Sequence, residues 1–150
     1  MVPGEFLITP NVVALLWPVL AYIGFVFFLY AYLTYVRKRA VKAGRVETSC
    51  FVLGREEPIE VARVTRNLGN QFELPAIYFF LILMLITLHQ VAWFDIAMAW
   101  LFLIGRVIHS YVQTQTDNVA LRGIIFTINF LAVIALAMHL GLALLRVPTA

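Results

Sequence analysis

Charged residues are scarce in this 150-residue chain: they make up 13% of it, while 63% is hydrophobic and the mean hydropathy is +0.92. Soluble domains are about a quarter charged, so this composition excludes an ordinary soluble protein. It also excludes a disordered chain, which needs low hydrophobicity and high net charge. Because one membrane-spanning helix takes about 20 apolar residues, the length leaves room for about four spans and for no separate soluble catalytic domain.

Cysteine is nearly absent, since Cys50 is the only one. A single cysteine can form neither an intramolecular disulfide nor a multi-thiolate metal site, so we expect neither in the fold. Cys50 also lacks the basic or helix-start setting that activates a thiol, and we interpret it as a spectator. The sequence contains no nucleotide-binding glycine loop, no metal-ligand cluster and no acyl-transfer triad pattern.

The basic residues are unevenly placed. Eight of the eleven lie between Arg37 and Arg66, and they form no stripe of the kind that binds nucleic acid. Those in the first long connection are Arg37, Lys38, Arg39, Lys42, Arg45 and Arg55. Such an excess is typical of a cytoplasmic loop, so residues 37–60 are predicted to face the cytoplasm and both termini the opposite side.

Four apolar runs predict an all-α integral membrane protein, with one four-helix transmembrane domain over residues 1–150. The predicted spans are residues 12–36, 61–88, 93–113 and 119–145. Pro75 predicts a bend in the second span. The first run is too long for the apolar core of a signal peptide and no Lys or Arg precedes it, so we expect a span there.

Charged side chains inside the spans are the most informative feature. Glu73, Arg106 and Arg122 lie well inside, and Arg66 lies nearer a boundary. Each costs about 2.5 to 3.5 kcal/mol at the centre of a span, even on the mildest scale. These groups must therefore be paired with one another or line a wet cavity.

Helical spacing gathers the polar residues on one face of each span. The sets are Arg63, Arg66, Asn70 and Glu73 on the second span, Arg106, His109 and Gln113 on the third, and Arg122 and Asn129 on the fourth. At 3.6 residues per turn, the first set occupies a stripe of about 80°. A rise of about 1.5 Å per residue puts the three sets at similar depth in the cytoplasmic half of the membrane.

An excess of arginine around one glutamate suits a small anion that has several carboxylates and an ammonium group. Arginine forks match carboxylates, and Glu73 can hold the amine. A positive charge near a bound thiol would also favour thiolate, and the apolar surface beside the stripe would admit a lipid-like second ligand. Two other interpretations stay open: the charges pair only to lock helices together, and His109 serves packing or hydrogen bonding.

These residues resemble the motifs of the MAPEG superfamily, the membrane-associated proteins in eicosanoid and glutathione metabolism. The second span resembles the family pattern Arg-x-x-Arg-x-x-x-Asn-x-x-Glu, with Pro75 following where members also place a proline. The third span resembles the Arg-x-x-His/Tyr pattern at Arg106 and His109. Arg122 stands where the prostaglandin E synthase branch has its catalytic arginine. The topology is similar over nearly the whole chain, and the motifs occupy about sixty residues.

The resemblance implies a four-helix bundle that assembles as a homotrimer, with glutathione bound at each subunit interface near the cytoplasmic side. Arg122 would stabilise the glutathione thiolate. The residues that would hold glutathione are Arg37, Arg66, Asn70, Glu73, Arg106, His109 and Gln113. The other partners would be membrane lipids and a hydrophobic small-molecule substrate, with no nucleic acid and no metal.

Three departures separate the chain from the prostaglandin and leukotriene synthase branches. Gly123 stands where the prostaglandin branch has a serine, and Phe126 and Gln113 stand at tyrosine positions. We therefore expect a glutathione transferase or peroxidase of the detoxifying kind, which acts on lipophilic electrophiles or lipid hydroperoxides. The alternative is a non-enzymatic trimeric scaffold that binds lipid or glutathione. A small transporter is a weaker third possibility, because a polar pocket biased to one side gives no through path.

Overall fold

The structure is a computed structural model, and it describes residues 9–53 and 57–146. The part of the chain so described contains helices and no strand. They are α1 (Pro10–Lys42), α2 (Cys50–Leu53), α3 (Ile59–Gly69), α4 (Leu74–Thr87), α5 (Trp93–Gln115) and α6 (Val119–Leu145). Arg55, one of the basic residues assigned to the first loop, lies outside the described residues.

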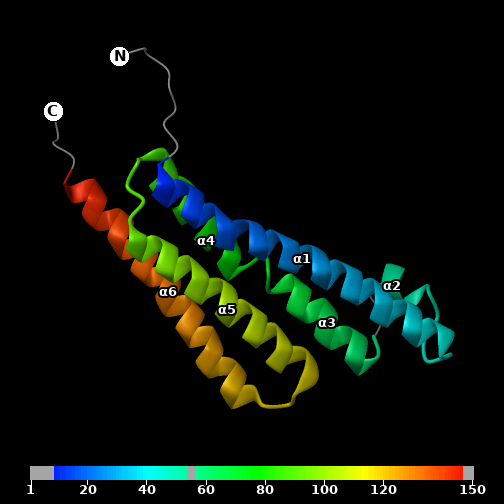
Figure 1. Cartoon of the computed structure of the whole chain (residues 1–150). Helices are drawn as coiled ribbons and strands as arrows, with labels where there is room; N and C mark the ends of the chain where they lie inside the picture. The colour runs from blue at the N-terminus through cyan, green and yellow to red at the C-terminus, as the bar shows by residue number, and fades with distance from the viewer. Residues whose placement is uncertain (1–8, 54–56, 147–150) are drawn as a thin grey trace, which may run out of the picture.

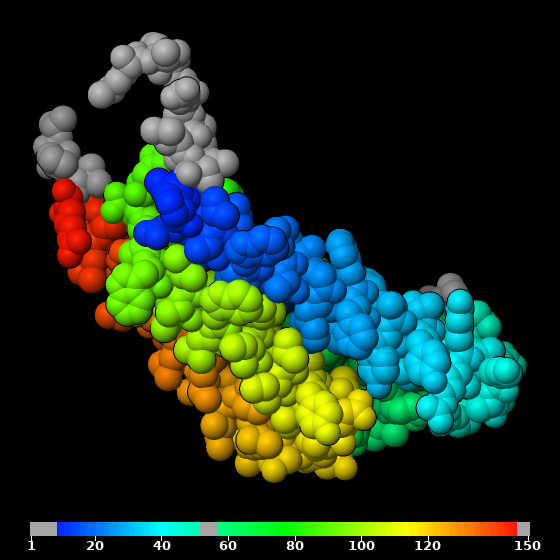
Figure 2. Space-filling view, viewed as in Figure 1, coloured from blue at the N-terminus to red at the C-terminus, as the bar shows by residue number. Residues whose placement is uncertain are grey.

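Four segments are long and apolar enough to cross a membrane: α1, the pair α3 and α4, α5, and α6. The prediction of an all-α bundle with four transmembrane helices is confirmed. Figure 1 shows that the start of α1 and the end of α6 lie at one end of the bundle, with the α5–α6 turn at the other. In Figure 2, α1 and α5 lie side by side along the visible face, in agreement with their contacts.

The helix ends follow local chemistry. Thr9 caps α1 by accepting a hydrogen bond from the Val12 amide, and Pro10 occupies the first turn, where its missing N–H costs nothing. At the other end Gly44 adopts φ 66°, and the Arg45 and Gly44 amides donate to the Ala40 and Val41 carbonyls. This Schellman arrangement ends α1 six residues beyond the predicted span boundary at 36.

The second span is broken rather than gently bent. Its helix stops at Gly69 and resumes at Leu74, so the break precedes Pro75 instead of centring on it. Proline at position 75 cannot donate to the carbonyl of Gln71, and its ring would clash with that carbonyl in a continuous helix. The stripe predicted from Arg63 to Glu73 assumed one continuous helix, and that assumption is wrong from Asn70 onward.

Two apolar clusters lie on either side of this break. One joins α1 to α4, α5 and α6 around side chains such as Tyr22, Tyr78 and Phe102. The other joins the second half of α1 to α3 around Leu33 and Val64. Because the polar residues Asn70, Gln71 and Glu73 interrupt the span between the clusters, the membrane interior of this bundle contains a polar level.

Candidate functional site

A buried hydrogen-bond network occupies this polar level, with Gln71 at its centre. The Gln71 Oε1 accepts from the Tyr22 hydroxyl at 2.8 Å and from the Arg106 Nε at 3.2 Å. Its Nε2 donates to the Asn67 carbonyl at 3.0 Å and to the Ser110 hydroxyl at 3.2 Å. These bonds tie α1, α3 and α5 together where the α-helix of the second span is interrupted.

Arg106 satisfies the broken end of α3. It is 1% exposed, and its Nη2 donates to the Asn70 carbonyl at 2.7 Å. Without a helical partner in an apolar setting, that carbonyl would cost several kcal/mol in the membrane. A cation at the carboxyl end of α3 also complements the helix dipole. Arg106 therefore stabilises the fold through acceptors of the protein itself.

A polar cavity of about 320 Å³, which we name the deep cavity, lies between α3, α5 and α6. Five of the predicted site residues line it, and Val119, Gly123 and Phe126 complete the wall. The five are Arg66, Asn70, His109, Gln113 and Arg122. Segments far apart in the sequence thus converge on one cavity, as the helical faces predicted.

A second polar cavity of about 300 Å³ adjoins the deep cavity beside the α5–α6 turn, and we name it the turn cavity. The two share four lining residues: Arg66, Gln113, Val119 and Arg122. The turn cavity adds side chains from the start of α3 and from the turn. They are Ile59, Ala62, Arg63, Val112, Thr116, Asp117 and Asn118.

The charges around the two cavities do not balance. Arg63 pairs with the carboxylate of Asp117, which is the one acidic residue that lines either cavity. Within the described residues, neither Arg66 nor Arg122 has a hydrogen bond or ion pair from its guanidinium to the protein. Two cations, the exposed Arg66 and the half-buried Arg122, therefore face one polar space without a counter-charge, an arrangement suited to an anion.

Two more polar residues form part of the wall of the deep cavity. Asn70 donates from its amide to Gln113 Oε1 at 3.0 Å, which joins the end of α3 to α5. His109 is 3% exposed, and its Nδ1 has no hydrogen-bond partner within the described residues. His109 therefore contributes to the wall of the deep cavity a buried ring whose Nδ1 is not held by the protein.

Three predicted site residues lie outside the deep cavity. Arg106 is held in the network described above. Glu73 is exposed in the break between α3 and α4, where its charge acts on Arg106 but it lines neither cavity. Arg37 bonds Glu57 at 2.8 Å and Thr65 at 3.4 Å, and its guanidinium lies over the ring of Phe51.

Asn129, predicted to share a face with Arg122, packs elsewhere. Its amide is fully buried against Gly105 of α5, where a side chain larger than hydrogen would collide with it. Gly105 thus permits the close approach of α5 and α6. The pair shapes the helix interface behind the deep cavity and lines neither cavity.

Sequence reasoning missed Gln71 and Asp117. Gln71 follows the motif residue Asn70 and precedes Pro75 by four positions. Because Pro75 has no N–H, it cannot donate to the backbone carbonyl of Gln71, and a polar residue at that position is the signal that could have identified Gln71. Asp117 lies between the third and fourth predicted spans, where nothing in the sequence marks it as part of a site. Its pairing with Arg63 joins residues 54 positions apart, which no local pattern encodes.

The wall of the deep cavity also shows the consequence of the three departures noted above. Gly123 has open space where a side chain would begin, with no heavy atom within 4 Å. Phe126 lines the cavity with an apolar ring and is 43% exposed. The cavity therefore meets the apolar surface of α6 at a wall that carries no hydroxyl group.

No site for a metal ion emerges from residues 9–53 and 57–146, since no three His, Cys, Asp or Glu side chains come together there. The chain matches the family model described as MAPEG family over residues 15–142. No curated protein and no solved structure matches it. The family match covers most of the sequence, including every residue of both cavities, and the chain belongs to the MAPEG family.

Proposed function

We propose that the protein is a membrane-bound glutathione transferase or peroxidase that activates the glutathione thiolate against lipophilic electrophiles or lipid hydroperoxides. Its four spanning helices and its family make it an integral, multi-pass membrane protein. MAPEG family members use glutathione as substrate or cofactor, and they include transferases and peroxidases. The observation that carries the proposal is the pair of uncompensated guanidinium groups, Arg66 and Arg122, in one polar cavity.

The cavity residues divide into binding and activating groups. The Arg66 fork suits a carboxylate of glutathione, and the amides of Asn70 and Gln113 suit its peptide groups. His109 contributes its imidazole ring to the cavity wall from α5. Arg122, beside Gly123 and Phe126, is the cation nearest the apolar surface of α6 and is assigned to the thiol, because a nearby positive charge lowers the pKa of a thiol.

Bound glutathione supplies the nucleophile: its sulfur forms a bond to an electrophilic carbon as the leaving group departs, or to a peroxide oxygen as the O–O bond breaks. In the second case the alkoxide that leaves takes a proton from water, and a second glutathione reduces the sulfenic acid, which gives the disulfide and water. Arg122 stabilises the negative charge of the glutathione thiolate before the sulfur attacks. Phe126 and the exposed apolar residues of α6 admit the second substrate from the bilayer. Electrostatic stabilisation by preorganised charges is the largest contribution to the rate enhancement of many enzymes.

The remaining predicted ligands fit an assembly of several copies. Arg37 contacts Thr65, on α3, which lines neither cavity, so Arg37 reaches no cavity of its own chain. In the proposed homotrimer a neighbouring copy supplies Arg37, and Glu73, exposed at the break, faces the ligand's amine. The basic loop of residues 37–60 faces the cytoplasm and both termini the opposite side.

A second candidate rests on the missing hydroxyls of Gly123, Phe126 and Gln113. Without them the site binds glutathione or lipid but lacks a group that assists the thiol, and the protein is a non-enzymatic trimeric scaffold. The two candidates differ in one observable, because only the enzyme turns over a hydrophobic electrophile or a lipid hydroperoxide.

The test compares Arg122→Ala with the wild type in conjugation and peroxidase assays, with glutathione binding measured on the same preparations. Loss of a single stabilising donor typically costs 10²- to 10³-fold in rate, so we expect a fall of about that size with binding retained. Arg146→Ala, at the opposite end of α6, is the matched control. Unchanged rates in Arg122→Ala would refute the role of Arg122, and no turnover by the wild type on a broad panel would favour the scaffold.

A further inference from the structure

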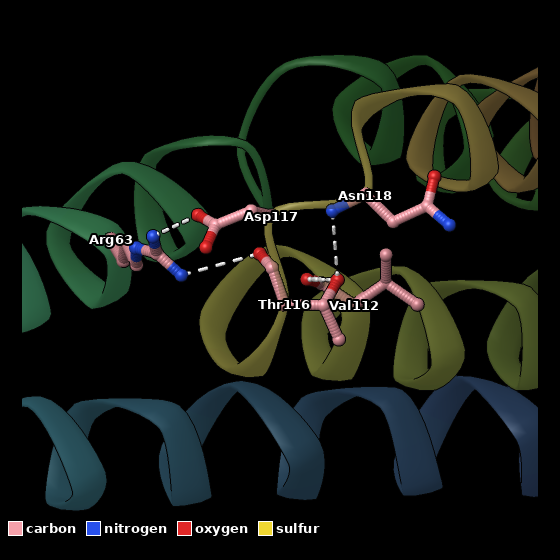
Figure 3. A network of polar contacts seen from close by, with 5 residues as sticks. All are labelled: Arg63, Val112, Thr116, Asp117 and Asn118. Atoms are coloured by element: carbon pink, nitrogen blue, oxygen red, sulfur yellow. Dashed lines mark hydrogen bonds and ion pairs between the residues drawn. The ribbon is translucent and has the colours of Figure 1, made fainter.

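The ion pair between Arg63 and Asp117 stands across the turn cavity and is absorbed by none of the roles given above. Figure 3 shows Arg63 reaching from α3 to the α5–α6 turn, where it meets the Asp117 carboxylate and the Thr116 carbonyl. The bond to the carbonyl is 3.2 Å long. Both residues line the turn cavity and not the deep cavity, which is the one that Phe126 lines.

The α5–α6 turn has internal bonds of its own besides those to Arg63. The Thr116 hydroxyl donates to the Val112 carbonyl at 2.8 Å and accepts from the Asn118 amide at 3.3 Å (Figure 3). The Asn118 side chain caps α6 by accepting from the Leu121 amide at 2.9 Å. Because these bonds fix the turn, Arg63 can leave it without unfolding it.

The two partners differ in their access to solvent. The side chain of Asp117 is 88% exposed, whereas that of Arg63 is 26% exposed and faces the cavity. Exposed ion pairs contribute little to stability, so this one is easily exchanged. Asp117 meets Arg63 through a single Nη2–Oδ1 contact. A carboxylate that enters the cavity can offer Arg63 a two-point fork contact in a less hydrated place, where charged hydrogen bonds are stronger.

We propose that Asp117 is an internal competitor: it occupies Arg63 in the empty protein and yields it to a carboxylate of the anionic ligand. This inference rests on the proposed function, because it takes glutathione as the ligand. The shared wall of the two cavities lets one extended molecule contact Arg122 and Arg66 in the deep cavity and Arg63 in the turn cavity. Asp117 thereby makes the site selective for ligands with a carboxylate at that distance.

The test is a double-mutant cycle of glutathione affinity, measured by calorimetry on the full chain. Asp117→Asn frees Arg63, and we expect glutathione to bind about two- to fivefold more tightly, the worth of an exposed pair. Arg63→Gln removes the contact and weakens binding about tenfold or more. In the Arg63→Gln background, Asp117→Asn has no effect, because Asp117 acts only through Arg63.

Glu60→Gln is the matched control, since it removes one carboxylate from an exposed pair with Arg45 at the start of α3, outside both cavities. Equal tightening in this control, or tightening by Asp117→Asn in both backgrounds, would mean simple repulsion of anions and overturn the inference. Weaker or unchanged binding in Asp117→Asn would mean a structural clasp and overturn it too. These outcomes leave the proposed function intact, whereas no glutathione binding by the wild type overturns both. Arg63→Lys, which retains the charge without the fork, separates loss of a ligand from loss of folding.

Discussion

Arginine has opposite roles in two neighbouring regions of this bundle. In the network at the break of the second span, Arg106 is buried and donates to Gln71 and to the Asn70 carbonyl. In the two cavities, the guanidinium groups of Arg66 and Arg122 have no such acceptors within the described residues. The comparison teaches that an intramembrane charge indicates function when its partners are missing, and structure when the protein supplies them.

The largest expected effect lies in the buried region. Arg106→Met leaves the Asn70 carbonyl and one Gln71 bond without a donor in an apolar setting. We expect the free energy of unfolding to fall by about 3 to 5 kcal/mol, the cost of breaking a buried charged network. Thermal unfolding in detergent measures it. Arg66→Met is the control, and a comparable loss of stability there would remove the contrast between the two regions.

A smaller effect tests the same network from α1. Tyr22→Phe removes one hydroxyl donor to Gln71 Oε1, while the Arg106 bond to that atom remains. The expected loss is about 1 kcal/mol, the net worth of one hydrogen bond, and the buried ring stays in place. The same unfolding measurement applies, with Tyr30→Phe, an exposed tyrosine on the same helix, as its control. A loss as large as that of Arg106→Met would show that Tyr22, and not Arg106, holds the break together.

The smallest expected effect is a change in reaction rate, and it concerns the deep cavity. Gly123→Ser places a hydroxyl in open space beside Arg122, where nothing collides with it. A hydrogen bond to the thiolate favours the charged form, so conjugation should speed up by about two- to tenfold, equivalent to one ordinary hydrogen bond. Stopped-flow conjugation rates measure the change, and Gly141→Ser, also in open space on α6, is the control. A slower reaction would mean that the cavity requires the space that Gly123 leaves.

Long apolar runs predict the four spans, and helical periodicity predicts which face of α5 carries the polar residues. Arg106, His109 and Gln113 recur on one face of a continuous helix, so their common direction follows from the 3.6-residue repeat. The second span could not be treated in this way, because Pro75 breaks the helix upstream and turns Glu73 out of the phase that its spacing implied.

Partner choice was the other unpredictable part. No local pattern indicates that Arg37 bonds Glu57, or that Arg106 bonds backbone and amide acceptors, and their role as glutathione ligands stays a prediction. Local patterns fix where a side chain points along its own helix, but not which acceptor from a distant segment meets it. Contacts made across the fold then decide whether a charged side chain is fully paired with acceptors of the protein.

Titration of glutathione into the protein in nanodiscs measures whether the uncompensated arginines form a glutathione-binding site. Arg66→Ala should weaken binding by about tenfold or more, because it removes a charged hydrogen-bond donor from the carboxylate. Arg146→Ala, which removes an exposed arginine far from both cavities, should bind as the wild type does. Saturable binding that Arg66→Ala weakens and Arg146→Ala preserves is the predicted result. No binding at millimolar glutathione, or equal binding by all three proteins, would contradict the account.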